Sequence, residues 1–293
     1  MKIKSVRLPT IALALCSMLV IQGFCYAKHT VAVAVPPMKF LIQEIGGDDW
    51  NCIVLADKGQ DPHIFEPSPK LMEQLKECDL FFKGELKFEE VLLKKLAKIN
   101  PEMKVVPLEK KPATKKHLAG RSYTDHDDSI DPHGWMSLIT LSRYAQIISR
   151  EFALLDSANS ETYKKRADAF YEKSQKMQAE YLARLKEAEI TAIAVYHPAW
   201  GHFAKEFNLK QIAIEAHGLE PGPRHLHNVN IELKKHNVSK IFAQNKAEAS
   251  RVSEIAKTHQ IETVIISPLF ENPVATIKAT VDALCDTDKS ENK

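Results

Sequence analysis

The chain is organised around residues 159–188, which read NSETYKKRADAFYEKSQKMQAEYLARLKEA. Apolar or small residues recur there at spacings of three and four, which places them on one face of an α-helix. These positions are Tyr163, Ala167, Phe170, Ser174, Met177, Tyr181, Leu185 and Ala188. At ~1.5 Å per residue this helix is ~45 Å long, enough to run along two domains. The wider stretch from Trp135 to His197 contains neither Gly nor Pro, so nothing in it interrupts a helical connector.

Short apolar runs alternate with amphipathic patterns on both sides of this helix. Before it, we expect helices near 38–45, 69–77 and 86–98 between strands at Thr30–Val35, Cys52–Leu55, Leu80–Phe82 and Lys104–Leu108. After it, we expect helices near 199–207, 225–236, 247–258 and 272–284, and strands at Thr191–Tyr196, Gln211–Glu215, Lys240–Ala243 and Thr263–Ile266. Alternating strands and helices predict parallel sheets. The predicted fold class is α/β, with two lobes, each a four-stranded parallel sheet flanked by helices, joined by one long rigid helix.

The first 27 residues are typical of a secretory signal peptide. A basic segment precedes an apolar run over 11–21, and Cys25-Tyr26-Ala27 fits a small-x-small cleavage site. The apolar run is shorter than the ~20 residues that a membrane-spanning helix needs. Large residues precede both cysteines of this segment, so a lipid-attachment motif fits poorly. We therefore expect cleavage after Ala27 and a periplasmic protein.

The rest of the chain divides into an N-terminal lobe (28–157), a linking helix (158–189) and a C-terminal lobe (190–293). The chain has 293 residues, with 40 Lys+Arg against 38 Asp+Glu, which exceeds one ordinary domain and gives no electrostatic reason to expect nucleic acid. Outside the leader, Cys52, Cys78 and Cys285 allow at most one disulfide in an oxidising compartment. We expect a monomer.

Three of the 12 histidines adjoin a proline and lie beyond the carboxyl end of a predicted strand. His63 lies in Asp61-Pro62-His63 after the second strand, and His133 lies in Asp131-Pro132-His133 after the fourth strand and a long loop. His197 closes the fifth strand. Open α/β sheets bind their ligands beyond the carboxyl ends of strands. Three neutral imidazoles at one point would form a first-row transition-metal site, with Zn–N bonds of ~2.0–2.1 Å if the metal is zinc.

Other residues are candidates for supporting roles at this site. Asp61 and Asp131 could accept hydrogen bonds that fix the tautomer of a histidine ring. His217, after the sixth strand, is a possible extra ligand. The 109–131 loop has no clear periodicity, and we interpret it either as a flap that makes weak metal contacts through His117 and His126 or as a solvated loop.

At this point the sequence resembles the periplasmic substrate-binding proteins of zinc and manganese ABC importers, and most nearly the zinc-binding ZnuA-type branch. The resemblance covers essentially the whole chain after the leader. It rests on Gly46-Gly47-Asp48, residues 61–69 (DPHIFEPSP), Cys78-Asp79-Leu80 with Gly84, residues 131–135 (DPHGW), residues 196–200 (YHPAW) with Phe203, and residues 220–223 (EPGP). It implies two α/β lobes joined by a rigid helix, a metal ion in the cleft between them, and an ABC permease in the inner membrane as the partner.

One position departs from the family pattern. The family often supplies a fourth ligand, an aspartate in a D-P-L motif after the last strand, where this chain has Ser267-Pro268-Leu269. Because a serine hydroxyl is a poor zinc ligand, we expect water, Glu66, His217 or a flap residue there. Three imidazoles with few oxygens suit Zn²⁺ better than Mn²⁺. The flap would be a reduced form of the His-rich loop of the zinc branch.

The resulting hypothesis is a binding protein that captures Zn²⁺ through His63, His133 and His197 and makes or breaks no bond. A zinc hydrolase is an alternative, since three histidines and a water also build catalytic zinc sites. The sequence lacks an H-E-x-x-H motif and offers only Glu66 as an acid or base beside the water. A surface adhesin on the same fold also remains open.

Overall fold

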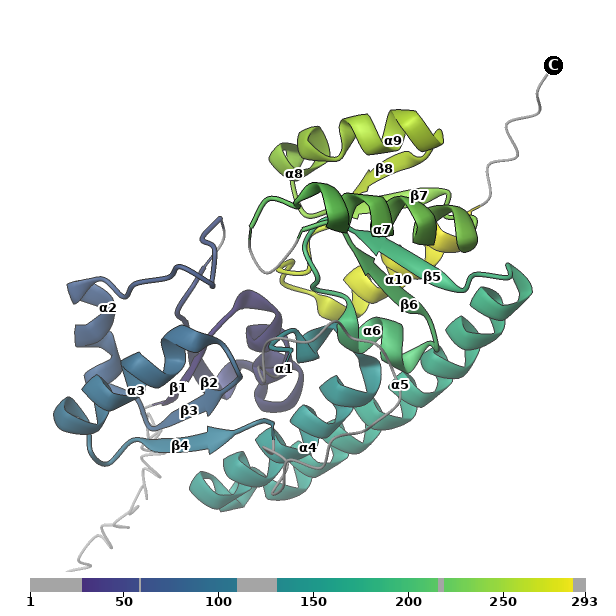
Figure 1. Cartoon of the computed structure of the whole chain (residues 1–293). Coiled ribbons are helices and arrows are strands. Elements are labelled where there is room, and N and C mark those ends of the chain that lie inside the picture. Colours follow the sequence, from purple (N-terminus) through teal and green to yellow (C-terminus); the bar gives the residue numbers. More distant parts are fainter. Residues whose placement is uncertain (1–27, 58, 110–130, 216–218, 287–293) are drawn as a thin grey trace, which may run out of the picture.

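The computed structural model describes residues 28–57, 59–109, 131–215 and 219–286. Figure 1 shows two α/β lobes with long helices running beneath them. The first lobe contains, in chain order, β1 (His29–Val33), α1 (Pro36–Gly46), β2 (Trp50–Val54), α2 (Pro69–Gln74), β3 (Leu80–Lys83), α3 (Lys87–Ile99) and β4 (Lys104–Pro107). The second contains β5 (Ala192–Val195), α6 (Gly201–Glu206), β6 (Lys210–Ala213), α7 (Pro223–Lys235), β7 (Lys240–Ala243), α8 (Lys246–Arg251), α9 (Ser253–His259), β8 (Glu262–Ile265) and α10 (Pro273–Cys285).

Both sheets are parallel and have the same strand order. The first runs β2-β1-β3-β4 and the second runs β6-β5-β7-β8. The central strands β1 and β5 are buried on both faces, which explains why they read as continuous apolar runs such as Val31-Ala32-Val33. The predicted fold class is confirmed, and all eight predicted strands are present within one or two residues of their expected bounds.

The predicted long helix is α5 (Ser160–Glu187), and its 28 residues span ~42 Å. Six of the eight positions expected on its apolar face are buried, and Met177 is partly buried against the same core. The helix packs against α1 and α10, so it contacts both lobes. Its length and its two-sided packing make it the connector that the sequence indicated.

Two helices differ from the sequence-based expectation. The Gly- and Pro-free stretch before α5 forms a separate helix, α4 (Leu138–Leu155), which begins where the Ser137 hydroxyl accepts a hydrogen bond from the Thr140 amide. It ends at Asp156, whose backbone leaves the helical region. The helix expected near 247–258 is divided into α8 and α9 at the fully buried Val252. Neither boundary is marked by Gly or Pro.

The lobes share one hydrophobic core. It includes Val33 and Met136 of the first lobe together with Trp200 and Phe203 of the second. Trp135 lies in a 3-10 turn (Gly134–Met136), is 4% exposed, and donates a hydrogen bond from Nε1 to the carbonyl oxygen of Pro268 at 2.8 Å. The lobes are therefore held together by packed side chains as well as by α5.

The three cysteines among the described residues are free thiols. Burial raises the pKa of Cys52 and of Cys78 to about 12. Both thiols are therefore protonated, and so unreactive as nucleophiles, near neutral pH.

Candidate metal centre

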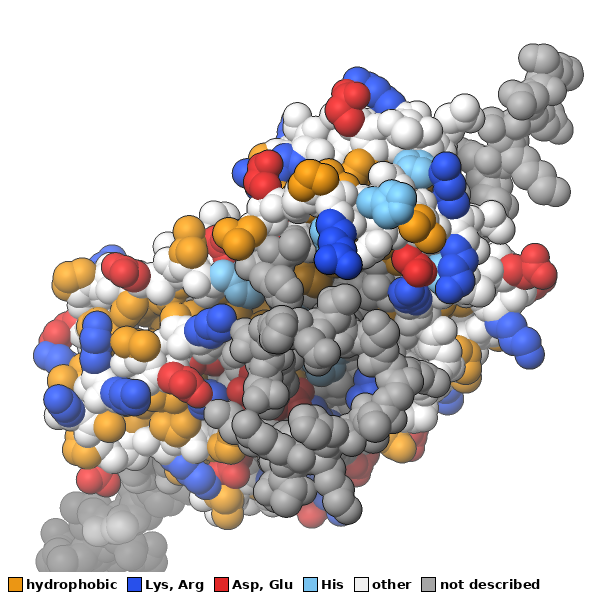
Figure 2. All heavy atoms as spheres, in the orientation of Figure 1, with side chains coloured by type: hydrophobic (Ala, Val, Ile, Leu, Met, Phe, Trp, Pro, Cys, Tyr) orange, Lys and Arg blue, Asp and Glu red, His pale blue; other side chains and the backbone are white. Residues whose placement is uncertain are grey.

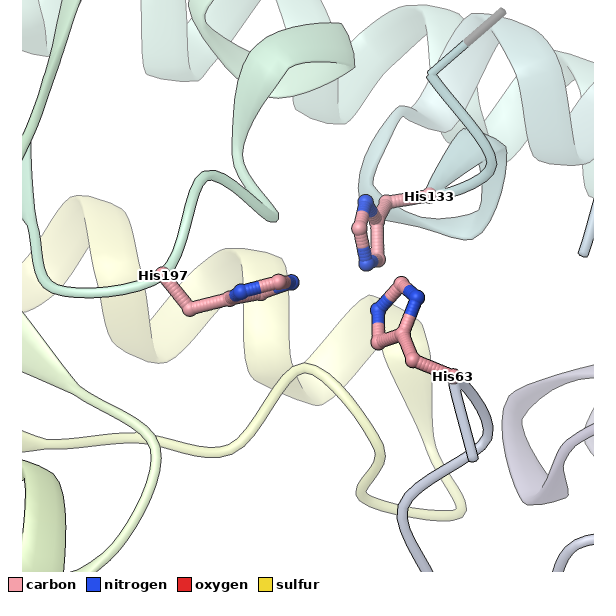
Figure 3. A group of neighbouring side chains, drawn as sticks. All are labelled: His63, His133 and His197. Carbon is pink, nitrogen blue, oxygen red and sulfur yellow. The ribbon is translucent and has the colours of Figure 1, made fainter. Parts of the chain in front are cut away.

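Three histidine rings from three separate loops converge between the lobes. His63 follows β2, His133 follows β4, and His197 follows β5 after one residue. Figure 3 shows the three rings pointing toward one another. Their ligand atoms all lie within 4.8 Å of one another, and no other such group of His, Cys, Asp and Glu side chains occurs among the residues that the structure describes. The structure thus brings the three predicted ligands together.

The two Asp-Pro-His segments fold in the same way. The Asp61 Oδ1 atom accepts a hydrogen bond from the His63 amide at 2.8 Å, and the Asp131 Oδ1 atom accepts one from the His133 amide at 3.0 Å. Such aspartate turns, with a proline of fixed φ between the two residues, leave the loop little conformational freedom. Each turn therefore presents its imidazole in a defined direction.

The Asp131 carboxylate also fixes the ring of His133. Its Oδ1 atom lies 2.8 Å from His133 Nδ1, as the sequence led us to expect. Asp61, the matching residue of the other turn, contacts the backbone of His63. Gly201 makes room for Asp131, because a Cβ atom at this position would clash with the Asp131 carboxylate.

A second carboxylate, Glu215, supports the ring of His197. Its two carboxylate oxygens lie 3.2 and 3.3 Å from His197 Nδ1. Sequence reasoning did not single out Glu215, although it predicted this residue as the last of a strand. The same strand-end rule that found the histidines, applied to carboxylates, would have drawn attention to it.

The three rings differ in their exposure. His133 is 5% exposed, His197 is intermediate, and His63 is exposed. The Nε2 atom of His197 is buried and has no hydrogen-bond partner among the described residues. A buried nitrogen without a partner costs free energy, and coordination of a cation would compensate for it.

The environment favours the neutral form of two of the imidazoles, those of His63 and His133. Desolvation, together with the neighbouring rings of His133 and His197, lowers the pKa of His63 to about 4. Burial also lowers the pKa of His133, although Asp131 acts in the opposite direction. Burial would raise the pKa of Asp131, but its hydrogen bonds with His133 hold that pKa below its usual value. Neutral imidazoles beside an ionised carboxylate are the state that binds a metal ion.

We expect the metal-free protein to lose stability as the pH falls from about 6.5 to about 4. The unfolded chain takes up a proton at His63 near pH 6.5, whereas the folded chain does so only near a pKa of about 4. Between these two pKa values the unfolded chain binds the proton and the folded chain does not, so protonation favours unfolding. The folded state therefore keeps its full stability above pH ~6.5 and loses this contribution as the pH falls toward the pKa of His63 in the folded chain. Urea denaturation of zinc-free protein at about pH 7 and about pH 5 measures the effect. The His63→Gln variant should lose less stability over this interval, and an equal loss in parent and variant would refute the assignment.

Of the other candidate ligands that the sequence offered, the structure describes Glu66 and Ser267. Glu66 is exposed and is not part of the group of three. The Ser267 hydroxyl accepts a hydrogen bond from the Leu269 amide at 3.2 Å. His117, His126 and His217 lie outside the described residues, as does the predicted flap except for its ends. His202, which was not assigned a role, lies with Nε2 at 3.1 Å from the Asp131 carbonyl oxygen.

The donor set has a definite chemical preference. Three neutral imidazoles suit Zn²⁺ and other borderline divalent ions, whereas Mn²⁺, Mg²⁺ and Ca²⁺ prefer oxygen ligands. Zinc commonly takes four ligands in a tetrahedron, so three histidines leave one position for water or for another group. The residues that the structure brings together therefore fit a zinc ion better than a hard cation.

Two α/β lobes that share a core and one long helix, with three histidines converging between them, define a two-lobed α/β protein with a candidate metal site between its lobes. The chain belongs to the ZnuA family: residues 31–284 match the family described as zinc-uptake complex component A, periplasmic. The match spans both lobes and all three histidines, and the resemblance drawn from the sequence motifs is confirmed.

Known relatives support this assignment. The chain is 24% identical to the zinc-binding lipoprotein AdcA of Streptococcus pneumoniae over 253 residues, which are 83% of this chain and 50% of AdcA. It is 26% identical to the high-affinity zinc uptake system protein ZnuA of Bacillus subtilis, over 80% of this chain and 78% of that protein. A crystal structure of ZnuA has a TM-score of 0.76 and 27% identity, covering 88% of this chain and 98% of its own. The chain spans about half the length of its AdcA relatives.

Proposed function

We propose that this protein is the extracytoplasmic substrate-binding component of a zinc import system. It captures Zn²⁺ through His63, His133 and His197 and delivers the ion to an ABC permease in the membrane. The observation that carries the proposal is the convergence of three imidazoles from both lobes, with ligand atoms within 4.8 Å of one another, in a chain of the ZnuA family. Because the described residues add no carboxylate or thiol to this group, we propose water as the fourth ligand.

We further propose that the chain binds its metal without catalysing a reaction. Hydrolysis at a three-histidine zinc site needs an acid or base beside the metal-bound water. Glu66, the candidate from the sequence, is exposed and lies outside the histidine group. The carboxylates that do lie close, Asp131 and Glu215, are engaged with the histidine Nδ1 atoms. This arrangement supports binding rather than catalysis.

The leader and the two-lobed fold suggest where the protein acts and how its chain is divided. We propose export through the leader at 1–27, cleavage after Ala27, action as a monomer in the periplasm, and the division into lobes 28–157 and 190–293 joined by 158–189. Among the described residues, no helix has the length and apolar character needed to cross a membrane. On the face in Figure 2, basic and acidic side chains are interspersed over both lobes. That face therefore gives no electrostatic reason to expect nucleic acid as a partner.

Calorimetry with zinc-free protein tests the proposal. We expect one equivalent of Zn²⁺ to bind tightly and Mn²⁺ to bind far more weakly, because imidazole ligands favour zinc and Mn²⁺ stands lowest in the divalent series. Metal analysis of protein purified without chelators should likewise find zinc. Tighter binding of Mn²⁺ than of Zn²⁺, or no binding of either, would rule out a zinc carrier.

A further inference from the structure

Glu215 is held beside His197 by the backbone of the second sheet. Beyond the last paired residues of β5 and β6, the Ile214 amide donates to the Val195 carbonyl and the Glu215 amide donates to the Tyr196 carbonyl, both at 2.9 Å. The parallel ladder thus continues for two residues past β6. It brings the Glu215 side chain next to the ring that follows β5.

The contact between Glu215 and His197 is largely shielded from solvent. Their side chains are 11% and 15% exposed, and both Glu215 oxygens lie within 3.3 Å of His197 Nδ1. An ionised carboxylate only accepts hydrogen bonds, so in the neutral ring Nδ1 carries the proton and Nε2 keeps its lone pair. Nε2 of His197 is the buried nitrogen without a partner. The tautomer that Glu215 selects is therefore the one that can bind a cation through Nε2.

The two lobes hold their histidines in matching ways. The Asp131 carboxylate is hydrogen-bonded to Nδ1 of His133 in the first lobe, and the Glu215 carboxylate is hydrogen-bonded to Nδ1 of His197 in the second. An acidic side chain therefore stands behind each of two of the three rings, close to the point where the rings converge. In a partly buried site such charges interact more strongly than they do in water.

We propose that Glu215 is a positioning residue for metal binding, which fixes the His197 tautomer and places an acidic side chain behind that ring. The inference rests on the proposed zinc-binding function and extends it to a residue outside the three ligands. Its effect on affinity is that of a carboxylate behind a metal-bound histidine, whose removal weakens binding by about 10–100-fold.

Three variants separate the possible roles of Glu215. Glu215→Leu removes both acceptor and charge and should weaken Zn²⁺ binding about 10–100-fold in a chelator competition assay. Glu215→Gln keeps an acceptor and loses the charge, so its loss should be smaller. Glu248→Gln is the matched control, because Glu248 lies near His197 and Glu215 but accepts a hydrogen bond from the Gln244 amide. Equal losses in Glu248→Gln and Glu215→Gln, or parent-like affinity in a folded Glu215→Leu variant, would overturn the proposal.

A measurement without metal separates this inference from the proposed function. Nitrogen NMR of the metal-free parent should show His197 protonated at Nδ1, and Glu215→Leu should shift its ring toward the Nε2-protonated tautomer. A purely structural role for Glu215 predicts no change of tautomer. Failure of the parent to bind zinc would contradict the proposed function, whereas an unchanged tautomer in Glu215→Leu would contradict the role of Glu215.

Discussion

Replacement of His133 by alanine is expected to weaken zinc binding by more than about 100-fold, because loss of a ligand should exceed the loss of a carboxylate that supports one. His133 is the most buried of the three rings and donates a hydrogen bond from Nδ1 to the Asp131 carboxylate at 2.8 Å. The variant loses a ligand and leaves the Asp131 carboxylate without its ring partner. Zinc competition against a chromophoric chelator measures the affinity, and circular dichroism checks that the variant is folded.

The same assay on the other histidines makes the test specific. His63→Ala and His197→Ala should also weaken binding strongly. His259→Ala is the control, since His259 ends α9 and its Nε2 atom lies 2.7 Å from Asn230. If all three ligand variants keep the affinity of the parent, the site assignment is wrong. His133→Gln, which preserves most of the side-chain volume, should behave like His133→Ala if coordination rather than packing is lost.

Replacement of Trp135 by alanine is expected to lower the free energy of unfolding by about 3–5 kcal/mol, the usual cost of removing a buried aromatic side chain. Trp135 is 4% exposed, belongs to the core shared by the lobes, and lies with its ring centroid 5.4 Å from that of His133. Its Nε1 atom donates a hydrogen bond to the Pro268 carbonyl oxygen of the second lobe. The substitution therefore removes packing and an interlobe hydrogen bond at the same point.

Urea denaturation of the metal-free protein measures this loss. Trp135→Phe keeps an aromatic ring but not the N–H donor, so it should lose less, with about 1–3 kcal/mol coming from the unsatisfied Pro268 carbonyl. An exposed aromatic residue, Phe270 at 56% exposure, provides the control variant Phe270→Ala. A loss below about 1 kcal/mol in Trp135→Ala would show that the lobes do not depend on this contact.

Much of the fold follows from local pattern. Apolar runs such as Val31-Ala32-Val33 mark central parallel strands because both faces of those strands are buried. The spacing of apolar residues along 159–188 marks the buried face of α5 because one face of that helix packs on the lobes. The Asp-Pro-His segments also predicted where His63 and His133 would lie, since proline and aspartate restrict the chain at strand ends.

What the sequence did not predict depends on contacts between distant residues. Glu215 reaches His197 only because β5 and β6 are neighbours in register. The hydrogen bond from Trp135 to Pro268 joins residues 133 positions apart, and no local pattern signals it. The division of the expected helix 247–258 at Val252 likewise coincides with a fully buried residue rather than with a helix-breaking one.

The unequal exposure of the three rings has a kinetic consequence. His133 is buried and His197 is partly shielded, and the ring of each is hydrogen-bonded to a carboxylate. His63 is exposed, and Asp61 accepts a hydrogen bond from its backbone amide rather than from its ring. A competing ligand from solvent would therefore reach a bound metal ion first on the side of His63. Exchange by stepwise substitution would begin with the displacement of that ring, while the other two nitrogens retain the ion until the new bonds have formed.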